Sequence, residues 1–134
     1  MRNESELRSW LKHAMDSDRL FWIEHGAGGT LGLPDVLIAS HSQLVPVELK
    51  VGKVSGEGIW QPELRAAQIN TMRRMSEWGV WSYVLVGSIE DSSVWITNSR
   101  NIYKAQFEAM GKQSPVKMEP VADGIRILGL FRMH

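Results

Sequence analysis

Three ionisable residues, Asp35, Glu48 and Lys50, lie within two largely apolar segments of the sequence. Asp35 follows Pro34 directly and begins the first segment, residues 35–39. Glu48 and Lys50 belong to the second segment, residues 44–51, in which apolar residues alternate with polar ones. Side chains of a strand point alternately to its two faces, so Glu48 and Lys50 share one face, while the other face is apolar and suits a core.

Two carboxylates, with a lysine next to one of them on the same strand face, are the groups that metal-dependent phosphodiester hydrolysis uses. Carboxylate oxygens bind Mg²⁺, and an ammonium group stabilises or activates the attacking water. Each feature alone has a simpler interpretation, because a Pro-Asp dipeptide is a common turn start and a Glu-x-Lys strand face is typical of a solvated surface. The combination is more specific, since Asp35 begins the partner strand and its carboxylate can lie beside that of Glu48.

The elements that must position these residues follow from apolar periodicity and turn residues. We expect helices over residues 3–15 and 62–78 and strands over 20–23, 35–39, 44–51 and 80–86. Asn3 is suited to cap the first helix, Pro62 to occupy the first turn of the second, and Gly79 to end it. Weaker patterns predict a strand over 94–97, a helix over 102–110 and a terminal strand or cover over 124–131. The order predicts an α/β fold, with a mixed sheet flanked by helices.

Composition excludes several classes of protein. The chain has 134 residues, of which 43% are apolar and 22% charged, as is usual for one globular domain. The absence of cysteine excludes a disulfide framework and a thiolate zinc site. Because 15 basic residues balance 15 acidic ones, the chain does not coat nucleic acid by bulk charge, and a polyanion must meet a local patch.

Nucleotide cofactors and membranes are not expected as partners. The loop Gly26-Ala27-Gly28-Gly29 lacks the Gly-Lys-Ser/Thr ending of a phosphate-binding loop, and no dinucleotide fingerprint follows a strand. No run reaches the roughly 20 apolar residues that span a bilayer, and a charged stretch follows Met1 where a signal peptide would be apolar. We therefore expect a cytoplasmic protein, in a bacterium or a phage-infected cell.

The combination of motifs resembles the PD-(D/E)XK nuclease superfamily. It consists of Gly32-Leu33-Pro34-Asp35, an apolar strand, Val47-Glu48-Leu49-Lys50, Gln68 within a helix, and Gly79 before another apolar strand. Within the superfamily, the likeness is closest to the virus-type replication and repair nucleases (VRR-NUC), which are related to Holliday-junction resolvases. It covers about residues 1–88 and leaves 89–134 unexplained. We therefore expect one nuclease domain, with a catalytic core over 1–88 and a C-terminal extension packed on it.

This resemblance implies a restriction-endonuclease-like fold and Mg²⁺-dependent cleavage of DNA, in which Mn²⁺ can substitute. It implies that Asp35 and Glu48 bind the metal, that the Leu49 carbonyl is a backbone ligand, and that Lys50 orients or polarises the water. It also implies a catalytic-site glutamine that contacts the lysine or the substrate, which matches Gln68. On the core-facing side of its helix, Gln68 either reaches the site or is a hydrogen-bonded core amide.

The family places a further glutamate on the first helix, where Glu4 and Glu6 compete. Glu4 lies on the inward stripe with Leu7 and Leu11, whereas Glu6 falls about 100° to one side of Leu7. We therefore assign the metal-ligand role to Glu4. Glu6 has a structural alternative, because its spacing from Asn3 suits a capping box. A solvated or capping role for both glutamates remains the alternative.

Several other residues are candidates for contact with DNA. They are His25, Gly28, Gly29, Lys53, Arg73 and Arg74, with Lys12 as a further cation. The glycine loop would let the DNA backbone come close to the metals. A lone histidine is weak evidence, however, and two arginines in a row on a helix more often form a solvated face.

The chain has six tryptophans, which is many for its length. Trp22, Trp78, Trp81 and Trp95 fit core positions, whereas Trp60 has few apolar neighbours in the sequence. An exposed Trp60 would either stack on an unpaired base or pack across a dimer face, and we favour the dimer face.

The sequence thus favours a metal-dependent DNA endonuclease that acts on branched or structured DNA, compatible with a homodimer. A non-catalytic DNA-binding or assembly module with the same fold is the alternative, which the presence of Asp35, Glu48 and Lys50 together disfavours. A metal hydrolase of small phosphate esters has similar site chemistry, and a closed pocket in place of an open groove would favour it.

Overall fold

The computed structural model describes residues 1–14, 21–24, 34–40, 43–108 and 114–121. The helices are α1 (Glu4–Ala14), α2 (Ala66–Glu77) and α3 (Ser99–Glu108). The strands are β1 (Phe21–Glu24), β2 (Val36–Ser40), β3 (Gln43–Gly52), β4 (Ile59–Trp60), β5 (Tyr83–Ser88), β6 (Val94–Asn98), β7 (Val116–Lys117) and β8 (Glu119–Pro120). The candidate DNA contacts His25, Gly28 and Gly29 lie outside the described residues, as does the expected cover over 124–131.

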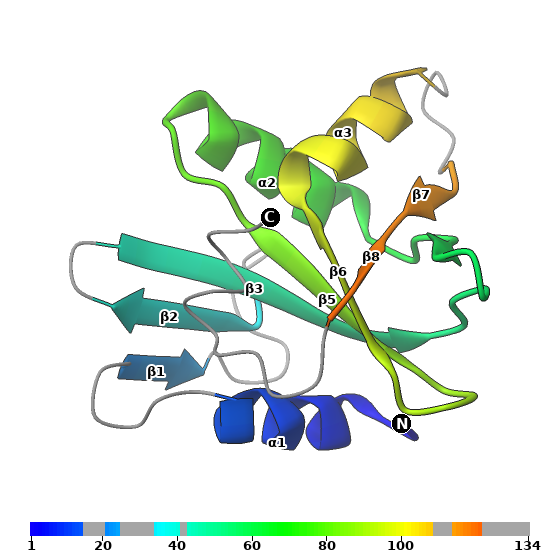
Figure 1. The fold of residues 1–134 in the computed structure, drawn as a ribbon. Coiled ribbons are helices and arrows are strands. Elements are labelled where there is room, and N and C mark those ends of the chain that lie inside the picture. The colour runs from blue at the N-terminus through cyan, green and yellow to red at the C-terminus, as the bar shows by residue number, and fades with distance from the viewer. Residues whose placement is uncertain (15–20, 25–33, 41–42, 109–113, 122–134) are drawn as a thin grey trace.

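A six-stranded mixed sheet forms the centre of the fold, in the order β1-β2-β3-β5-β6-β8. The central strands β3 and β5 are parallel, and the other neighbouring pairs are antiparallel. The helix α2 lies between β3 and β5 in the chain, as a parallel pair requires a crossover connection. Helix α1 covers one face of the sheet and α2 and α3 lie on the other (Figure 1). This confirms the predicted α/β fold with a mixed sheet flanked by helices.

Each sheet face has its own apolar core. The core on the Val47 and Leu49 face confirms the predicted alternation in β3, whereas the core on the Glu48 face was not predicted. Val47 and Leu49 are fully buried on the α1 side, together with Leu7 and Leu11 of the helix. The core on the other side contains Met72 of α2, Ile102 of α3 and the β5 residues Val84 and Val86. Burying one such aliphatic side chain contributes about 1.5–3 kcal/mol, so these two cores fix which way Glu48 and Lys50 point.

The helix ends agree with the sequence in two places and differ in one. Asn3 caps α1, because its Oδ1 accepts the Glu6 N–H at 3.0 Å. Gly79 follows α2 with a φ of +81°, which suits glycine at a helix end. The prediction that Pro62 lies in the first turn of α2 is wrong. The helix begins at Ala66, since Arg65 is extended with φ −71° and ψ 152°.

The elements after Gly87 continue the same sheet. Strand β6 pairs with β5 and adds one residue to the predicted strand over 94–97, while α3 begins at Ser99, three residues before the predicted start at 102. Strand β8 then pairs with β6, and the separate β4–β7 pair lies beside this edge (Figure 1). None of the described helices is long and apolar enough to cross a bilayer.

The tryptophans do not follow the expected division into core and surface. Trp60, expected at the surface, is 3% exposed, because β7 pairs with β4 and completes a core around it. Trp78 and Trp81, expected in the core, are 87% and 41% exposed. Trp95 does pack against the α2-side core. Trp60 therefore offers no surface for a base or a partner, and the side chain of Trp22 lies outside the described residues.

Candidate active site

The β2–β3 register brings Asp35 beside Glu48. Val36 pairs with Val47, and the two strands are antiparallel. Asp35, the residue before Val36, therefore lies across from Glu48, the residue after Val47. The backbone pairing of β2 with β3 ends at Val36. Beyond it the Asp35 side chain supplies the acceptor for β3, because its Oδ2 accepts the N–H of Leu49 at 3.0 Å. This hydrogen bond holds the part-buried carboxylate at the point where the two strands separate. The expected proximity of the two acidic residues is thus present in the fold.

Glu48 is a buried carboxylate with one oxygen satisfied and one not. The residue is 1% exposed. Its Oε1 accepts a hydrogen bond from Gln68 Nε2 at 2.9 Å and lies 3.9 Å from Lys50 Nζ. Its Oε2 is buried without a hydrogen-bond partner. A buried, unsatisfied carboxylate oxygen costs free energy unless a proton or a cation neutralises it, so the donor set fits a bound divalent cation.

The electrostatics of Glu48 agree with this interpretation. Burial, followed by the charge of the nearby Asp35, raises the pKa of Glu48 to about 8. Lys50 acts in the opposite direction, but its single charge does not outweigh burial and the nearby carboxylate. Glu48 therefore holds a proton at neutral pH when no cation is bound. Carboxyl groups perturbed in this way are concentrated at functional sites.

Helix α1 presents Glu4, and not Glu6, to this carboxyl pair. Burial and then the charge of Asp35 raise the pKa of Glu4, while Lys50 and Arg8 oppose them. Glu6 is exposed and accepts the N–H of Arg2 at 3.0 Å at the start of the helix. Glu6 thus takes part in capping the helix start through its bonds with Asn3 and Arg2, and the metal-ligand role of Glu4 stays a prediction. Sequence reasoning missed Arg8, which stands one helical turn after Glu4.

Both the oxygen and the nitrogen of the Gln68 side-chain amide form hydrogen bonds. Its Oε1 accepts the N–H of Arg65 at 2.9 Å, and its Nε2 donates to Glu48. The sequence left open whether Gln68 reaches the site or is a satisfied core amide, and the side chain does both. Its partner is the glutamate, whereas the family resemblance suggested the lysine or the substrate.

Lys50 lies at the edge of a small pocket. Its side chain is 22% exposed, and with Lys53, Trp60 and Gln61 it lines a hollow of about 120 Å³. Lys53 is more exposed, at 74%, and its Nζ lies 3.5 Å from the Glu90 carboxylate. Lys50 thus faces inward to the carboxylates, while Lys53 faces solvent.

The remaining basic candidates are surface residues. Arg73 and Arg74 are exposed on α2, and Lys12 is exposed on α1. Within the described parts of the chain, no three histidine, aspartate or glutamate side chains meet closely enough to form a complete metal cluster. The site consists of the adjacent pair Asp35 and Glu48, with Glu4 interacting at longer range.

Comparison with known proteins supports the fold. No family model and no curated protein sequence matches the chain. The structure is similar to that of Hjc, a Holliday junction resolvase from the archaeal hyperthermophile Archaeoglobus fulgidus, with a TM-score of 0.54 and 13% identity over 95% of each chain. The fold is therefore of the nuclease-like kind seen in that resolvase, and a likeness that covers 95% of the chain is not confined to residues 1–88.

Proposed function

We propose that this chain is a divalent-metal-dependent DNA endonuclease of the PD-(D/E)XK type. The observation that carries the proposal is the buried Glu48 carboxylate, which has an unsatisfied Oε2 beside Asp35 and Lys50 within 3.9 Å of Oε1. A site of purely structural purpose would leave no reason to bury Glu48 beside a second carboxyl group, because burial and the charge of Asp35 raise the cost of ionising Glu48.

Asp35, Glu48, the Leu49 carbonyl and Glu4 would hold the cation. The N–H and C=O of one strand residue point to the same side, and the Leu49 N–H already points to Asp35, so its carbonyl opens toward the same carboxylate. Oxygen ligands of this kind suit Mg²⁺ and Mn²⁺. When bound, the ion would supply charge neutralisation at the scissile phosphate and an acidified water.

The chain's own residues would prepare this reaction. Gln68 fixes the rotamer of Glu48 through its 2.9 Å hydrogen bond, and Leu49 fixes Asp35 through its N–H. Lys50 shares the strand face of Glu48, so its ammonium group lies where negative charge grows on the phosphate during attack. Preorganised charges of this kind stabilise the transition state more than the bound substrate.

Branched or structured DNA is the substrate class that we propose. The fold of an archaeal Holliday junction resolvase supports this choice, and a net charge of zero agrees with recognition by local contacts. Within the superfamily, we assign the chain to the VRR-NUC-like resolvases on its motifs, and we propose that it acts as a homodimer.

Cleavage assays on matched substrates test the proposal. Four-way junctions, flaps, nicked duplexes and plain duplexes would be incubated with Mg²⁺, Mn²⁺ or Ca²⁺, with the wild-type chain and its Glu48→Gln variant. We expect strand cleavage of at least one branched substrate with Mg²⁺ and Mn²⁺, and loss of cleavage in Glu48→Gln with DNA binding retained. Glu6→Gln is the matched control, since it removes an exposed carboxylate from the same protein. Binding without cleavage by the wild-type chain under all conditions would favour the non-catalytic module instead.

A further inference from the structure

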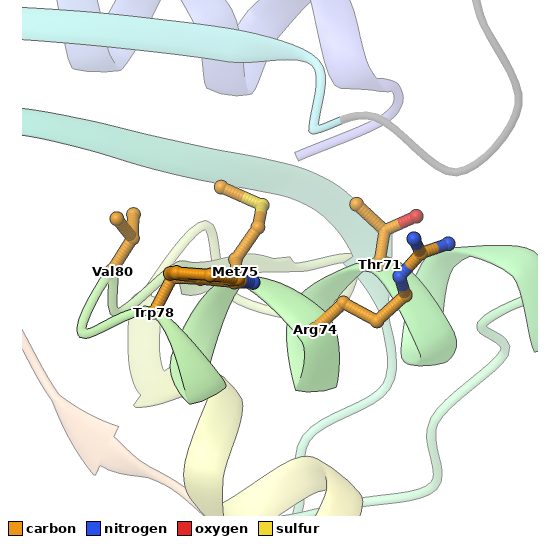
Figure 2. A pocket seen from close by; sticks show the side chains of 5 residues that line it. All are labelled: Thr71, Arg74, Met75, Trp78 and Val80. Atoms are coloured by element: carbon orange, nitrogen blue, oxygen red, sulfur yellow. The ribbon is translucent and has the colours of Figure 1, made fainter.

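Helix α2 carries an exposed tryptophan on a face that the candidate active site does not use. Trp78 is 87% exposed at the end of the helix. Thr71, Arg74, Met75 and Trp78 follow the spacing i, i+3, i+4, i+7 and therefore share one face of α2. With Val80 they line an open hollow of about 340 Å³. Figure 2 shows the indole ring edge-on near Met75, with the Arg74 guanidinium beside Thr71 at the other end.

This hollow lies along the same helix as Gln68, which contacts Glu48. Thr71 follows Gln68 by one helical turn, and Trp78 lies about 15 Å from Gln68 along the axis at 1.5 Å per residue. A DNA strand advances about 3.4 Å per nucleotide in B-form. A strand whose scissile phosphate lies at Glu48 could therefore reach Trp78 some four or five nucleotides away.

The lining has the chemistry of a nucleotide site. The indole, Met75 and Val80 supply apolar and aromatic surface, and Arg74 supplies the charge; none of the five lining residues is acidic. A nucleobase stacks on an exposed aromatic ring without regard to sequence, and a phosphate pairs with an arginine. A paired base cannot offer its face, whereas a base at a branch point can.

We propose that Trp78 stacks on an unpaired nucleobase of the DNA substrate, with Arg74 contacting the adjacent phosphate. The inference rests on the proposed function, and it gives that function a reason to prefer branched over continuous duplex DNA. It also assigns to Trp78 the stacking role that the sequence offered for Trp60.

A binding experiment with paired probes tests it. Fluorescence anisotropy would measure affinity, with Ca²⁺ in place of Mg²⁺, for a branched DNA with a short single-stranded arm and for the same DNA with abasic nucleotides in that arm. We expect Trp78→Ala to weaken binding of the intact arm by about 5- to 150-fold, the range that one stacked base gives, and to leave binding of the abasic probe unchanged. Trp78→Phe should retain part of the preference. Arg74→Ala should weaken binding of both probes and lower the salt slope by about one.

Trp81→Ala is the control, because Trp81 is a second exposed tryptophan outside the hollow. Unchanged affinity in Trp78→Ala, or equal loss on both probes, would overturn the inference. Light scattering that finds a dimer in the wild type and a monomer in Trp78→Ala would also overturn it, since a second copy would then cover the hollow. Cleavage by the wild-type chain separates the two hypotheses: cleavage without a Trp78 effect refutes only the stacking site, and absence of cleavage refutes the proposed function.

Discussion

Gln68 Nε2 donates a 2.9 Å hydrogen bond to the buried Oε1 of Glu48, and this bond joins the first turn of α2 to the central strand of the sheet. The other end of the same amide accepts the N–H of Arg65, the residue that caps the helix. One side chain thus accepts a hydrogen bond from the backbone N–H at the start of the helix and orients a candidate metal ligand. The start of α2 at Ala66 and the rotamer of Glu48 are therefore coupled.

Replacing Gln68 by methionine should destabilise the fold. Gln68→Met keeps the length of the side chain but leaves the Arg65 N–H and Glu48 Oε1 without this partner. We expect the free energy of unfolding to fall by about 1–3 kcal/mol, as is usual when buried polar groups lose a hydrogen bond. Urea denaturation at neutral pH measures the change. Asn70→Ala, an exposed position on the same helix, should change stability by less than about 0.5 kcal/mol. Equal effects at the two positions would contradict the coupling.

The raised pKa of Glu48 predicts a stability that falls with rising pH in the metal-free protein. The folded chain holds a proton on Glu48 up to about pH 8, whereas the unfolded chain releases it near its ordinary pKa of 4.5. The stabilising contribution is therefore complete below the unfolded value and is lost as the pH rises through about 8. Glu4, whose pKa is also raised, acts with the same sign.

Thermal melts in EDTA between about pH 5.5 and about pH 8.5 measure this effect. We expect the wild-type Tm to fall over the range by an amount that corresponds to a few kcal/mol. Glu48→Gln should melt with a shallower pH dependence and should be more stable than the wild type at the alkaline end, because a neutral amide replaces the buried charge. A wild-type Tm that rises with pH would show that Glu48 is ionised at little cost.

Glu4 and Glu6 should differ in their effect on the cation. Glu4→Ala removes a carboxylate that interacts with Asp35 and Glu48, so it should weaken Mn²⁺ binding by about tenfold or more. Glu6→Ala removes only a contact to the Arg2 N–H at the helix start and should leave the affinity unchanged. Isothermal titration with Mn²⁺ compares the two variants. The reverse order would mean that the inward face of α1 has been misassigned.

Lys50→Ala should slow the chemical step more than it weakens DNA binding. The Lys50 ammonium lies 3.9 Å from Glu48 Oε1. In the proposed reaction, charge would develop on the phosphate near this ammonium, so its effect should appear in the rate constant. Single-turnover cleavage at saturating DNA should slow by about 100-fold or more. Lys53→Ala, which removes a solvent-facing lysine, should mainly weaken binding and lower the salt slope. A saturated Lys50→Ala rate equal to wild type would make Lys50 a phosphate clamp.

Trp60 and Trp78 should respond oppositely to truncation. Trp60→Ala opens a cavity in the core between the sheet and α2, which costs about 3–5 kcal/mol for a buried aromatic side chain. Trp78→Ala removes an exposed ring and should leave the free energy of unfolding within about 0.5 kcal/mol of wild type. Chemical denaturation of both variants gives the comparison. A large loss in Trp78→Ala would show that this ring is part of the core.

The period-two pattern of β3 and the helical pattern of α1 are properties of neighbouring residues, so the sequence alone determined them. The first predicted the shared face of Glu48 and Lys50, and the second favoured Glu4 over Glu6 on the inward side of the helix. The hairpin of β2 and β3 likewise followed from two apolar runs and the polar turn between them. These local signals predicted the mixed α/β fold, and the resemblance of the motifs to the PD-(D/E)XK superfamily implied its nuclease-like form.

Other features depend on segments that are distant in the chain, and only the tertiary structure decided them. Trp60 is buried because β7, more than fifty residues later in the sequence, pairs with β4 and closes the core around it. The indole of Trp78 has core-like spacing, but no local pattern shows whether another element will cover a helix face. The pKa of Glu48 is raised because burial and the carboxyl of Asp35 act on it together, and both arise only when β2, β3 and α2 meet. A sequence specifies such charged groups and apolar faces. The free energy of ionising the groups or burying the faces depends on the neighbours that folding places beside them.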